Sequence, residues 1–462
     1  MHISKIMLAV AALSVGATAF AAPAAGRIAI SSGASATKGN LRTALTTLCT
    51  SGGGTLTEFT SGGNISTYVC NTTAALTPAQ YAAAADSSFR NFAGTAFAEL
   101  RLNVTGGSFT AVCLLNGFPA GTACANVNAG GAADKYRDPA STAGSAGGAD
   151  TVLPQAGQVI VGGLLDVAPG TWPTGVLSGL TIPAASGTGV GQSFGVAVSN
   201  ALYGKLFAAQ KSTGAATLSK PIPSSCLETD YTKLECIPTV SKGQMATIMS
   251  NNEFDAAHAK GVGFLTGDPA DETLVLEYNR RADTSGTQAS AQAYFLGLPC
   301  SSNPLTIADV SSVPAGTNNN IDIGLVKVFA HAGTGDVRNR LNDVTTTRYG
   351  IGIMSGENNQ SDAATTWKWV RVQGSALGES AKPGTLAQLG VTVTNRASVV
   401  NGGYDFYFES AVAPGSAAGA STFWSAVTGT LNTLAAPVGL LNASDLGGFN
   451  KGGNACQANA TN

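Results

Sequence analysis

A short run of polar residues, Arg280 to Gln288, holds the groups with the clearest chemical use in this sequence. It lies between a strand pattern at residues 273–278 and a helical pattern at residues 289–296, so we predict that it forms the start of a helix. A guanidinium fork, two hydroxyl donors and a backbone amide that no side chain covers occur here, on Arg281, Ser285, Thr287 and Gly286. Because the first amides of a helix have no partner within it, these groups together would bind a tetrahedral oxyanion.

Asp283 lies in the middle of this run, where a carboxylate would repel a fully ionised anion. A carboxylate can only accept hydrogen bonds, so it would accept one from a protonated phosphate and disfavour sulfate, which carries no proton at neutral pH. It could also orient the guanidinium of Arg281. Spacing alone leaves a second interpretation open, in which Asp283 only caps the helix and Arg281 is a solvated charge.

The rest of the chain alternates strand and helix patterns. A strand pattern at residues 27–30 leads through small residues into a helical stretch that ends near Cys49, a second junction able to bind an anion. Further strand patterns stand at 100–104, 159–165 and 194–198, and helical patterns follow Thr77 and cover 242–250 and 253–260. Residues 125–150 are rich in Gly, Ala, Asn and Asp and predict a long surface loop. This alternation predicts an α/β protein.

Several segments resemble one family, the periplasmic phosphate-binding proteins that serve ABC importers, within the type II periplasmic-binding-protein superfamily. Residues 281–287, Arg-Ala-Asp-Thr-Ser-Gly-Thr, are similar to the family's loop Arg-Ser-Asp-Gly-Ser-Gly-Thr. Residues 32–39 resemble the loop after the family's first strand, and residues 165–169 resemble its Ser-Asp-Ala-Pro loop, with Leu165 in place of the serine. Residues 349–354 and 401–406 resemble later family segments in the same order. Insertions at 50–75, 113–150 and 205–240 make this chain a divergent, longer relative.

The resemblance implies an α/β fold of two lobes, each a mixed sheet flanked by helices, joined by two crossover strands. Residues 22–195 and 350–462 would form the first lobe, and residues 196–349 the second. The implied ligand-binding residues are Thr37, Lys38, Ser108, Asp166, Arg281, Asp283, Ser285, Gly286 and Thr287. Asp166 would accept the proton of the ligand, and the ligand would bridge the lobes and drive their closure.

The function that the resemblance implies is capture of an inorganic oxyanion, phosphate first, for ABC-type uptake. The implied partners are phosphate or a related oxyanion and an ABC permease, with no cofactor, and proteins of this fold commonly act as monomers. The leucine before Asp166 leaves room for another oxyanion, such as a phosphonate or arsenate. A secreted or surface protein that uses the same fold without a transport role is the alternative.

The N-terminal residues predict export. Residues 1–21 have the charged start, apolar middle and small-residue end of a secretory signal peptide, with cleavage expected after Ala21. No later segment holds about 18 uninterrupted apolar residues, so no membrane insertion is expected. We therefore expect the mature protein in the periplasm or outside the cell.

The cysteine count fits an exported protein. Eight cysteines, an even number, favour disulfides over free thiols. Proximity in sequence suggests three local pairs and one distant pair, although spacing does not fix the connectivity: Cys49 with Cys70, Cys113 with Cys124, Cys226 with Cys236, and Cys300 with Cys456.

Composition argues against several other functions. Charged residues make up 11% of the chain, and 25 basic residues face 27 acidic ones, so no basic surface for nucleic acid is expected. Only three histidines occur, which gives little support to a metal site. Trp367 and Trp369 stand two apart on a strand pattern, where packing is expected rather than a platform for sugars or bases.

One enzyme motif is a minor alternative. Residues 191–195, Gly-Gln-Ser-Phe-Gly, match the nucleophile elbow of serine hydrolases, with His258 or His331 as a conceivable base. That elbow needs a strand before the serine and a helix after it. Here a glycine-rich loop precedes Ser193 and a strand pattern follows it, so we expect no hydrolase.

Overall fold

The computed structural model describes residues 23–73, 75–118, 121–128, 131–140, 151–212, 222–231, 233–250, 256–300, 320–331, 333–342, 348–358, 366–373, 404–434 and 440–441. The signal-peptide prediction, the segment 401–403 and Cys456 lie outside these residues. Among the described helices, none is both long and apolar enough to cross a membrane.

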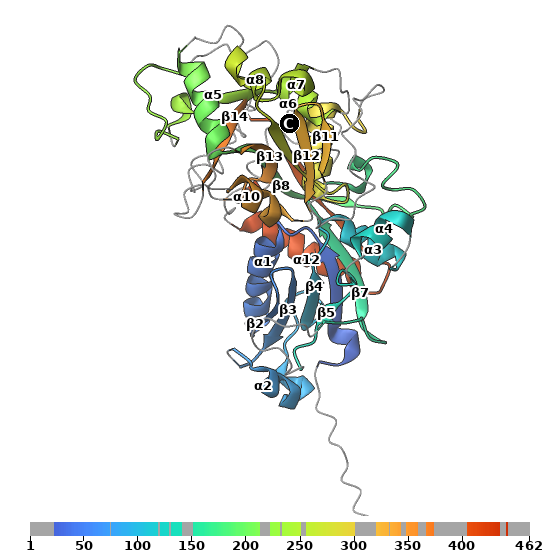
Figure 1. Cartoon of the computed structure of the whole chain (residues 1–462). Helices are drawn as coiled ribbons and strands as arrows, with labels where there is room; N and C mark the ends of the chain where they lie inside the picture. The colour runs from blue at the N-terminus through green and yellow to red at the C-terminus, as the bar shows by residue number, and fades with distance from the viewer. Residues whose placement is uncertain are drawn as a thin grey trace, which may run out of the picture.

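The protein is a mixed α/β structure built on one large curled sheet (Figure 1). Along the sheet the strands follow the order β11-β12-β10-β13-β8-β15-β7-β1-β4-β3-β2, with β14, β9 and β16 attached beside β8 and β14. The strands of this sheet are β1 (Ile28–Gly33), β2 (Thr55–Ser61), β3 (Ile65–Asn71), β4 (Glu99–Asn103), β7 (Val159–Leu165), β8 (Ser186–Ser199), β9 (Thr239–Ser241), β10 (Leu276–Arg281), β11 (Asn320–Ile323), β12 (Val326–His331), β13 (Tyr349–Ser355), β14 (Trp367–Gln373), β15 (Tyr407–Pro414) and β16 (Leu440–Leu441).

Helices follow most of the strands, as the alternating sequence pattern predicts. The α-helices are α1 (Lys38–Ser51), α2 (Pro78–Ala83), α3 (Phe109–Asn116), α4 (Gly121–Val127), α5 (Asn200–Ser212), α6 (Lys242–Met249), α7 (Ala256–Lys260), α8 (Val262–Thr266), α9 (Gly286–Ala291), α10 (Thr334–Leu341) and α12 (Ala420–Thr433). The other helical turns are the 3₁₀ turns η1 (Ala25–Arg27), η2 (Asp86–Ser88), η3 (Pro169–Thr171), η4 (Leu234–Cys236) and η5 (Pro269–Asp271), and the π-helix η6 (Gln292–Leu296) that continues α9.

Strand β1 is central and buried on both faces, which explains its apolar start. Ala29 belongs to the hydrophobic cluster that includes side chains of α1 and α12. Ile28 and Ile30 pack with Leu114 of α3 and with Tyr136, since successive side chains of a strand point to opposite faces. Figure 1 shows α1 and α3 on either side of this part of the sheet.

Strand β8 connects the two ends of the sheet. Its first half pairs with β15 and its second half with β13 and β14, all antiparallel. Residues 194–198 are thus the second half of a 14-residue strand. The main hydrophobic cluster includes Phe109 of α3, Phe194 of β8 and Tyr278 of β10, so it extends to both sides of β8. A division into two lobes stays a prediction, as do the domain boundaries.

Two local predictions need correction. Residues 125–150 are not all surface loop, because α4 reaches Val127 and the buried Tyr136 and Arg137 form strand β5 (Tyr136–Arg137), paired with β6 (Thr151–Val152). The Tyr136 hydroxyl bonds to the Ser32 hydroxyl at 2.8 Å, which anchors this segment beside β1. The strand expected at residues 273–278 begins later, at Leu276, and runs on to Arg281.

The three local disulfides are confirmed. Cys49 pairs with Cys70, Cys113 with Cys124, and Cys226 with Cys236. Cys300 is disulfide-bonded as well, whereas Cys456 is not described, so the distant pair stays a prediction. Three disulfides are consistent with a protein that folds in an oxidising compartment.

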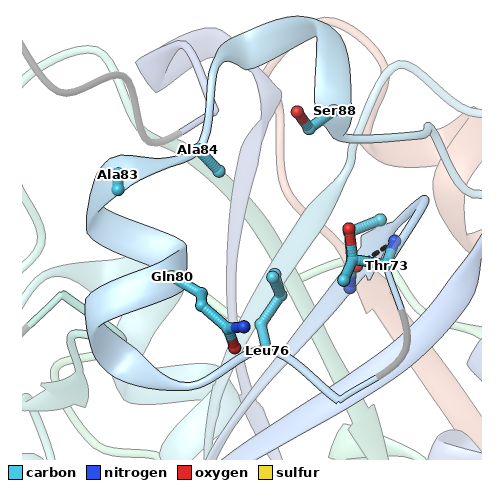
Figure 2. Close-up of a pocket in the computed structure, with 7 residues that line it drawn as sticks. Thr73, Leu76, Gln80, Ala83, Ala84 and Ser88 are labelled. Atoms are coloured by element: carbon cyan, nitrogen blue, oxygen red, sulfur yellow. Dashed lines mark hydrogen bonds between the residues drawn. The ribbon is translucent and has the colours of Figure 1, made fainter.

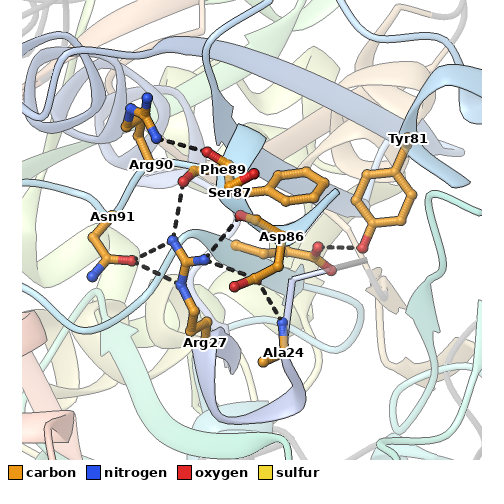
Figure 3. Close-up of polar contacts among 9 residues, drawn as sticks. Ala24, Arg27, Tyr81, Asp86, Ser87, Phe89, Arg90 and Asn91 are labelled. Carbon is orange, nitrogen blue, oxygen red and sulfur yellow. Dashed lines mark hydrogen bonds and ion pairs between the residues drawn. The ribbon is translucent and has the colours of Figure 1, made fainter. Parts of the chain in front are cut away.

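The segment before β1 is fastened by one arginine (Figure 3). The Arg27 guanidinium donates to Asp86 Oδ1 at 2.8 Å, to Asn91 Oδ1 at 2.8 Å and to the Phe89 carbonyl at 3.1 Å. These contacts join η1 to the loop around η2 and hold the start of the central strand in place.

Candidate functional site

The ends of the parallel strands bring the candidate residues to one edge of the sheet. Strand β1 runs parallel to both β4 and β7, so the carboxyl ends of the three strands lie together. Ser108 comes after β4 and is the N-cap of α3, and Asp166 directly follows β7. In open α/β sheets, ligands bind outside such carboxyl ends.

Asp166 and Ser108 form a buried pair at this edge. The Ser108 hydroxyl donates to Asp166 Oδ2 at 2.8 Å and accepts from the Asp166 backbone amide at 3.1 Å. Asp166 is only 4% exposed, and its Oδ1 is buried without a hydrogen-bond partner in the described part of the chain. Burial raises the pKa of Asp166 to about 6, against the opposing effects of the Ser108 hydrogen bond and the Arg281 charge.

Gly286 packs directly on this pair. A Cβ added to Gly286 would lie 2.6 Å from Ser108 Oγ and 2.7 Å from Asp166 Oδ2. Any residue other than glycine would therefore force neighbouring atoms to move. A Cβ added to Gly107 would lie 3.7 Å from Ser285 Cα and 3.9 Å from Arg281 Nη2. The start of α9 therefore lies against the loop that precedes α3 and against the end of β7.

Arg281, at the end of β10, brings a cation to the same place. It is 3% exposed, its Nη1 donates to Thr334 Oγ1 at 2.5 Å, and its backbone amide donates to the Gln288 side chain at 3.1 Å. Burial lowers the pKa of Arg281 to about 10, while nearby Asp166, Asp336 and Glu357 act to raise it. The guanidinium thus stays charged at neutral pH.

Asp283 does not orient Arg281 as the sequence suggested. Its carboxylate pairs with the guanidinium of Arg280, three residues earlier in the chain. Arg280 and Arg281 are neighbours in a strand, so their side chains point to opposite faces, and Asp283 reaches the first of them. Thr334, at the start of α10, holds the Arg281 fork instead.

The remaining predicted residues lie at helix starts. Thr37 precedes α1 and is buried, but its hydroxyl donates to the Ala34 carbonyl, and the Lys38 ammonium donates to the Gly63 carbonyl. Ser285 and Thr287, at the start of α9, are each 2% exposed. The structure therefore brings Ser108, Asp166, Arg281 and Gly286 into one cluster, and no hydrogen bond among the described residues joins Thr37 or Lys38 to it.

Sequence reasoning missed Glu357, which follows β13. Ser355 Oγ donates to its Oε1 at 2.6 Å, and Gln192 Nε2 donates to its Oε2 at 3.2 Å. Burial raises the pKa of Glu357 to about 7, and the charge of Asp166 adds to that rise. The signal available in the sequence was its position shortly after residues 349–354, one of the segments that carry the family resemblance.

The alternative sites gain no geometric support. The motif at residues 191–195 lies inside β8, so no strand-to-helix elbow forms around the buried Ser193. His331 bonds to Asn279 at 3.0 Å, and burial lowers its pKa to about 4. Trp367 and Trp369 are fully buried and pack edge to face at 5.1 Å, as expected for core residues. The described residues contain no group of three or more metal-ligating side chains.

A separate surface pocket lies beside α2 (Figure 2). It has a volume of about 280 Å³, and its lining residues are Asn71, Thr73, Leu76, Gln80, Ala83, Ala84 and Ser88. None of these described lining residues is charged, so they offer no counter-charge to an oxyanion.

The substitution Asp166→Asn should reduce the pH dependence of stability. Because the pKa of Asp166 is raised to about 6, the folded protein holds a proton that the unfolded chain releases at lower pH. The resulting stabilisation is complete below about pH 4 and is lost as pH rises through about 6, an effect of about 3 kcal/mol. Urea unfolding of ligand-free protein at several pH values measures it. Parallel stability curves for the parent and D166N would show that Asp166 does not titrate in this range.

Comparisons with known proteins add little to this geometry. No family model matches the sequence, and no curated protein matches it. Among solved structures, the chain is similar to "a possible phosphate binding protein" from Planctomyces limnophilus DSM 3776, at 10% identity and a TM-score of 0.29, over 83% of this chain and 80% of that chain.

Proposed function

We propose that this protein is an exported solute-binding protein that captures an inorganic oxyanion, phosphate first, beside Asp166 and Arg281. The observation that carries the proposal is the buried Asp166 Oδ1, which has no hydrogen-bond partner within the described residues. A buried carboxylate oxygen without a donor is costly, so a ligand that brings a proton to it would be stabilised there.

The groups around Asp166 supply what the rest of such a ligand needs. Arg281 gives a buried positive charge, and hydrogen bonds between ionised groups are stronger than neutral ones. The first amides of α9, at Gly286 and beyond, have no partner within their helix. Ser108 holds the Asp166 carboxylate in a fixed orientation through two hydrogen bonds.

This arrangement explains how phosphate would be preferred to sulfate. The ionised Asp166 can accept a hydrogen bond from a hydroxyl of hydrogen phosphate, whereas sulfate would place an unprotonated oxygen against it. A sulfate oxygen and the Asp166 carboxylate are both acceptors, so in a buried site each would be left without a hydrogen bond. The site should therefore bind sulfate much more weakly than phosphate.

The proposal extends to transport. The site residues come from chain segments on both sides of β8, so a bound oxyanion would join them and favour a closed form that an ABC permease could distinguish from the empty protein. In this proposal the mature chain acts in the periplasm or outside the cell, as a monomer and without a cofactor.

Titration calorimetry tests the binding proposal. The protein is unfolded, freed of ligand and refolded, and then phosphate or sulfate is added. We expect one phosphate per chain and an affinity for sulfate at least about 1000-fold lower. Asp322→Asn, at an exposed carboxylate on β11, serves as the matched control for Asp166→Asn and should bind like the parent. Equal affinity for the two ions, or no heat from either, would reject the proposal.

A further inference from the structure

A second carboxyl group, that of Glu357, lies at the same edge of the sheet as Arg281, because β13 and β10 are parallel neighbours and their carboxyl ends lie together. Glu357 follows β13, while Asp166 follows β7 and Arg281 ends β10. Its two oxygens are held separately, Oε1 by the Ser355 hydroxyl at 2.6 Å and Oε2 by the Gln192 amide at 3.2 Å. The carboxyl group therefore has a fixed orientation and is not a mobile surface charge.

The charges at the site do not favour a fully ionised anion. Glu357 and Asp166 lie close enough for each to affect the same guanidinium, because both act to raise the pKa of Arg281. Asp336 of α10 acts on Arg281 in the same direction. Gln192 and Ser355, the partners of Glu357, have neutral side chains. Three carboxyl groups thus act on one guanidinium, and a dianion added beside them would increase the negative charge at the site.

The free lone pairs of Glu357 offer a way to reduce that charge. A carboxylate has about four acceptor positions, and the contacts from Ser355, Gln192 and the backbone amide of Glu357 itself do not use them all. Glu357 as a whole residue is partly exposed, unlike Asp166. A hydroxyl of the ligand could donate there.

We propose that Glu357 is a second acceptor of a ligand proton, so that the site selects the dihydrogen form of a tetrahedral oxyanion, with one hydroxyl donating to Asp166 and the other to Glu357. This inference rests on the proposed function and deepens it, since it names the protonation state of the ligand. No bond is broken, and the second proton comes from solvent whenever the free ligand carries only one.

Proton uptake on binding measures this directly. At about pH 8.5 both free carboxyls are ionised and free phosphate carries a single proton, so the parent must take up about one proton per phosphate bound. The phosphate affinity of the parent should also fall about tenfold for each pH unit above that point. In Glu357→Gln the side-chain amide can donate to an unprotonated ligand oxygen, so the variant should bind monohydrogen phosphate with no uptake and an affinity independent of pH in this range.

The experiment is phosphate calorimetry at about pH 8.5 in two buffers of different ionisation enthalpy, on ligand-free parent, E357Q and the control Glu272→Gln. Glu272 is a partly exposed carboxylate paired with Lys260, so its substitution should leave the proton count of the parent unchanged. The ionisation of phosphate itself is common to all three proteins and cancels in the comparison.

The outcomes separate this inference from the proposed function. Uptake of about one proton by the parent and none by E357Q would support the inference. Phosphate binding by the parent with no proton uptake would overturn it without need of any variant, and so would equal uptake by the parent and E357Q, and in both cases the proposed function would stand. A parent that binds no phosphate at any pH would overturn the proposed function and this inference together.

Discussion

Replacing Arg281 by alanine should lower phosphate affinity by about 100- to 1000-fold, because removal of one partner from a buried charged contact costs several kcal/mol. The guanidinium is 3% exposed and held in place by Thr334. Its loss would leave the carboxyl groups of Asp166 and Glu357 without the cation that acts on both. Phosphate calorimetry on ligand-free protein measures the change.

Two further variants sharpen that experiment. Arg281→Lys keeps the charge but loses the planar fork, so it should retain part of the affinity that Arg281→Ala removes. Arg90→Ala removes an arginine whose hydrogen bond to the Ser87 carbonyl lies at the surface (Figure 3), and it should bind like the parent. Parent-like affinity in R281A would show that the oxyanion site lies elsewhere.

Replacing Gly286 by alanine should lower phosphate affinity by about 10- to 100-fold, since forced overpacking typically costs 1–3 kcal/mol. The new methyl group would lie 2.6 Å from Ser108 Oγ and 2.7 Å from Asp166 Oδ2, closer than atoms approach in proteins. The start of α9 would have to move away from Asp166, which would separate the Asp166 carboxylate from the α9 amides. Calorimetric titration with phosphate again gives the affinity.

The matched control is Gly429→Ala in α12. A Cβ there would meet nothing within 4 Å, and alanine favours helix over glycine, so this variant should bind like the parent and be slightly more stable. Normal affinity in G286A would mean that α9 does not need its close approach to Asp166 for binding.

The sequence predicted correctly those features that depend on residues close together in the chain. The strand, loop and helix at residues 27–49 appear as β1 and α1, and the Thr77–Pro78 signal appears as a full capping box at the start of α2. The three short-range disulfides also follow from sequence proximity. Backbone propensity and short loops are enough to decide such features.

The contacts that complete the site could not be read in the same way. Thr334 and Glu357 reach Arg281 and Asp166 only because α10 and β13 pack beside β10, far apart in sequence. Arg280 and Arg281 are adjacent in a strand, so their side chains point to opposite faces and Asp283 can pair with only one of them. Residue types alone do not say which face Asp283 shares. The buried Tyr136 was hidden in a stretch whose composition resembles loop.

The most direct test of the central claim is to locate a tetrahedral oxyanion crystallographically, by anomalous scattering from arsenate in crystals of refolded, ligand-free protein. The account predicts one strong peak within hydrogen-bonding contact of Asp166 Oδ1 and the Arg281 guanidinium, beside the first turn of α9. Absence of a peak there, or a peak only in the pocket between Thr73, Gln80 and Ser88 (Figure 2), would contradict it.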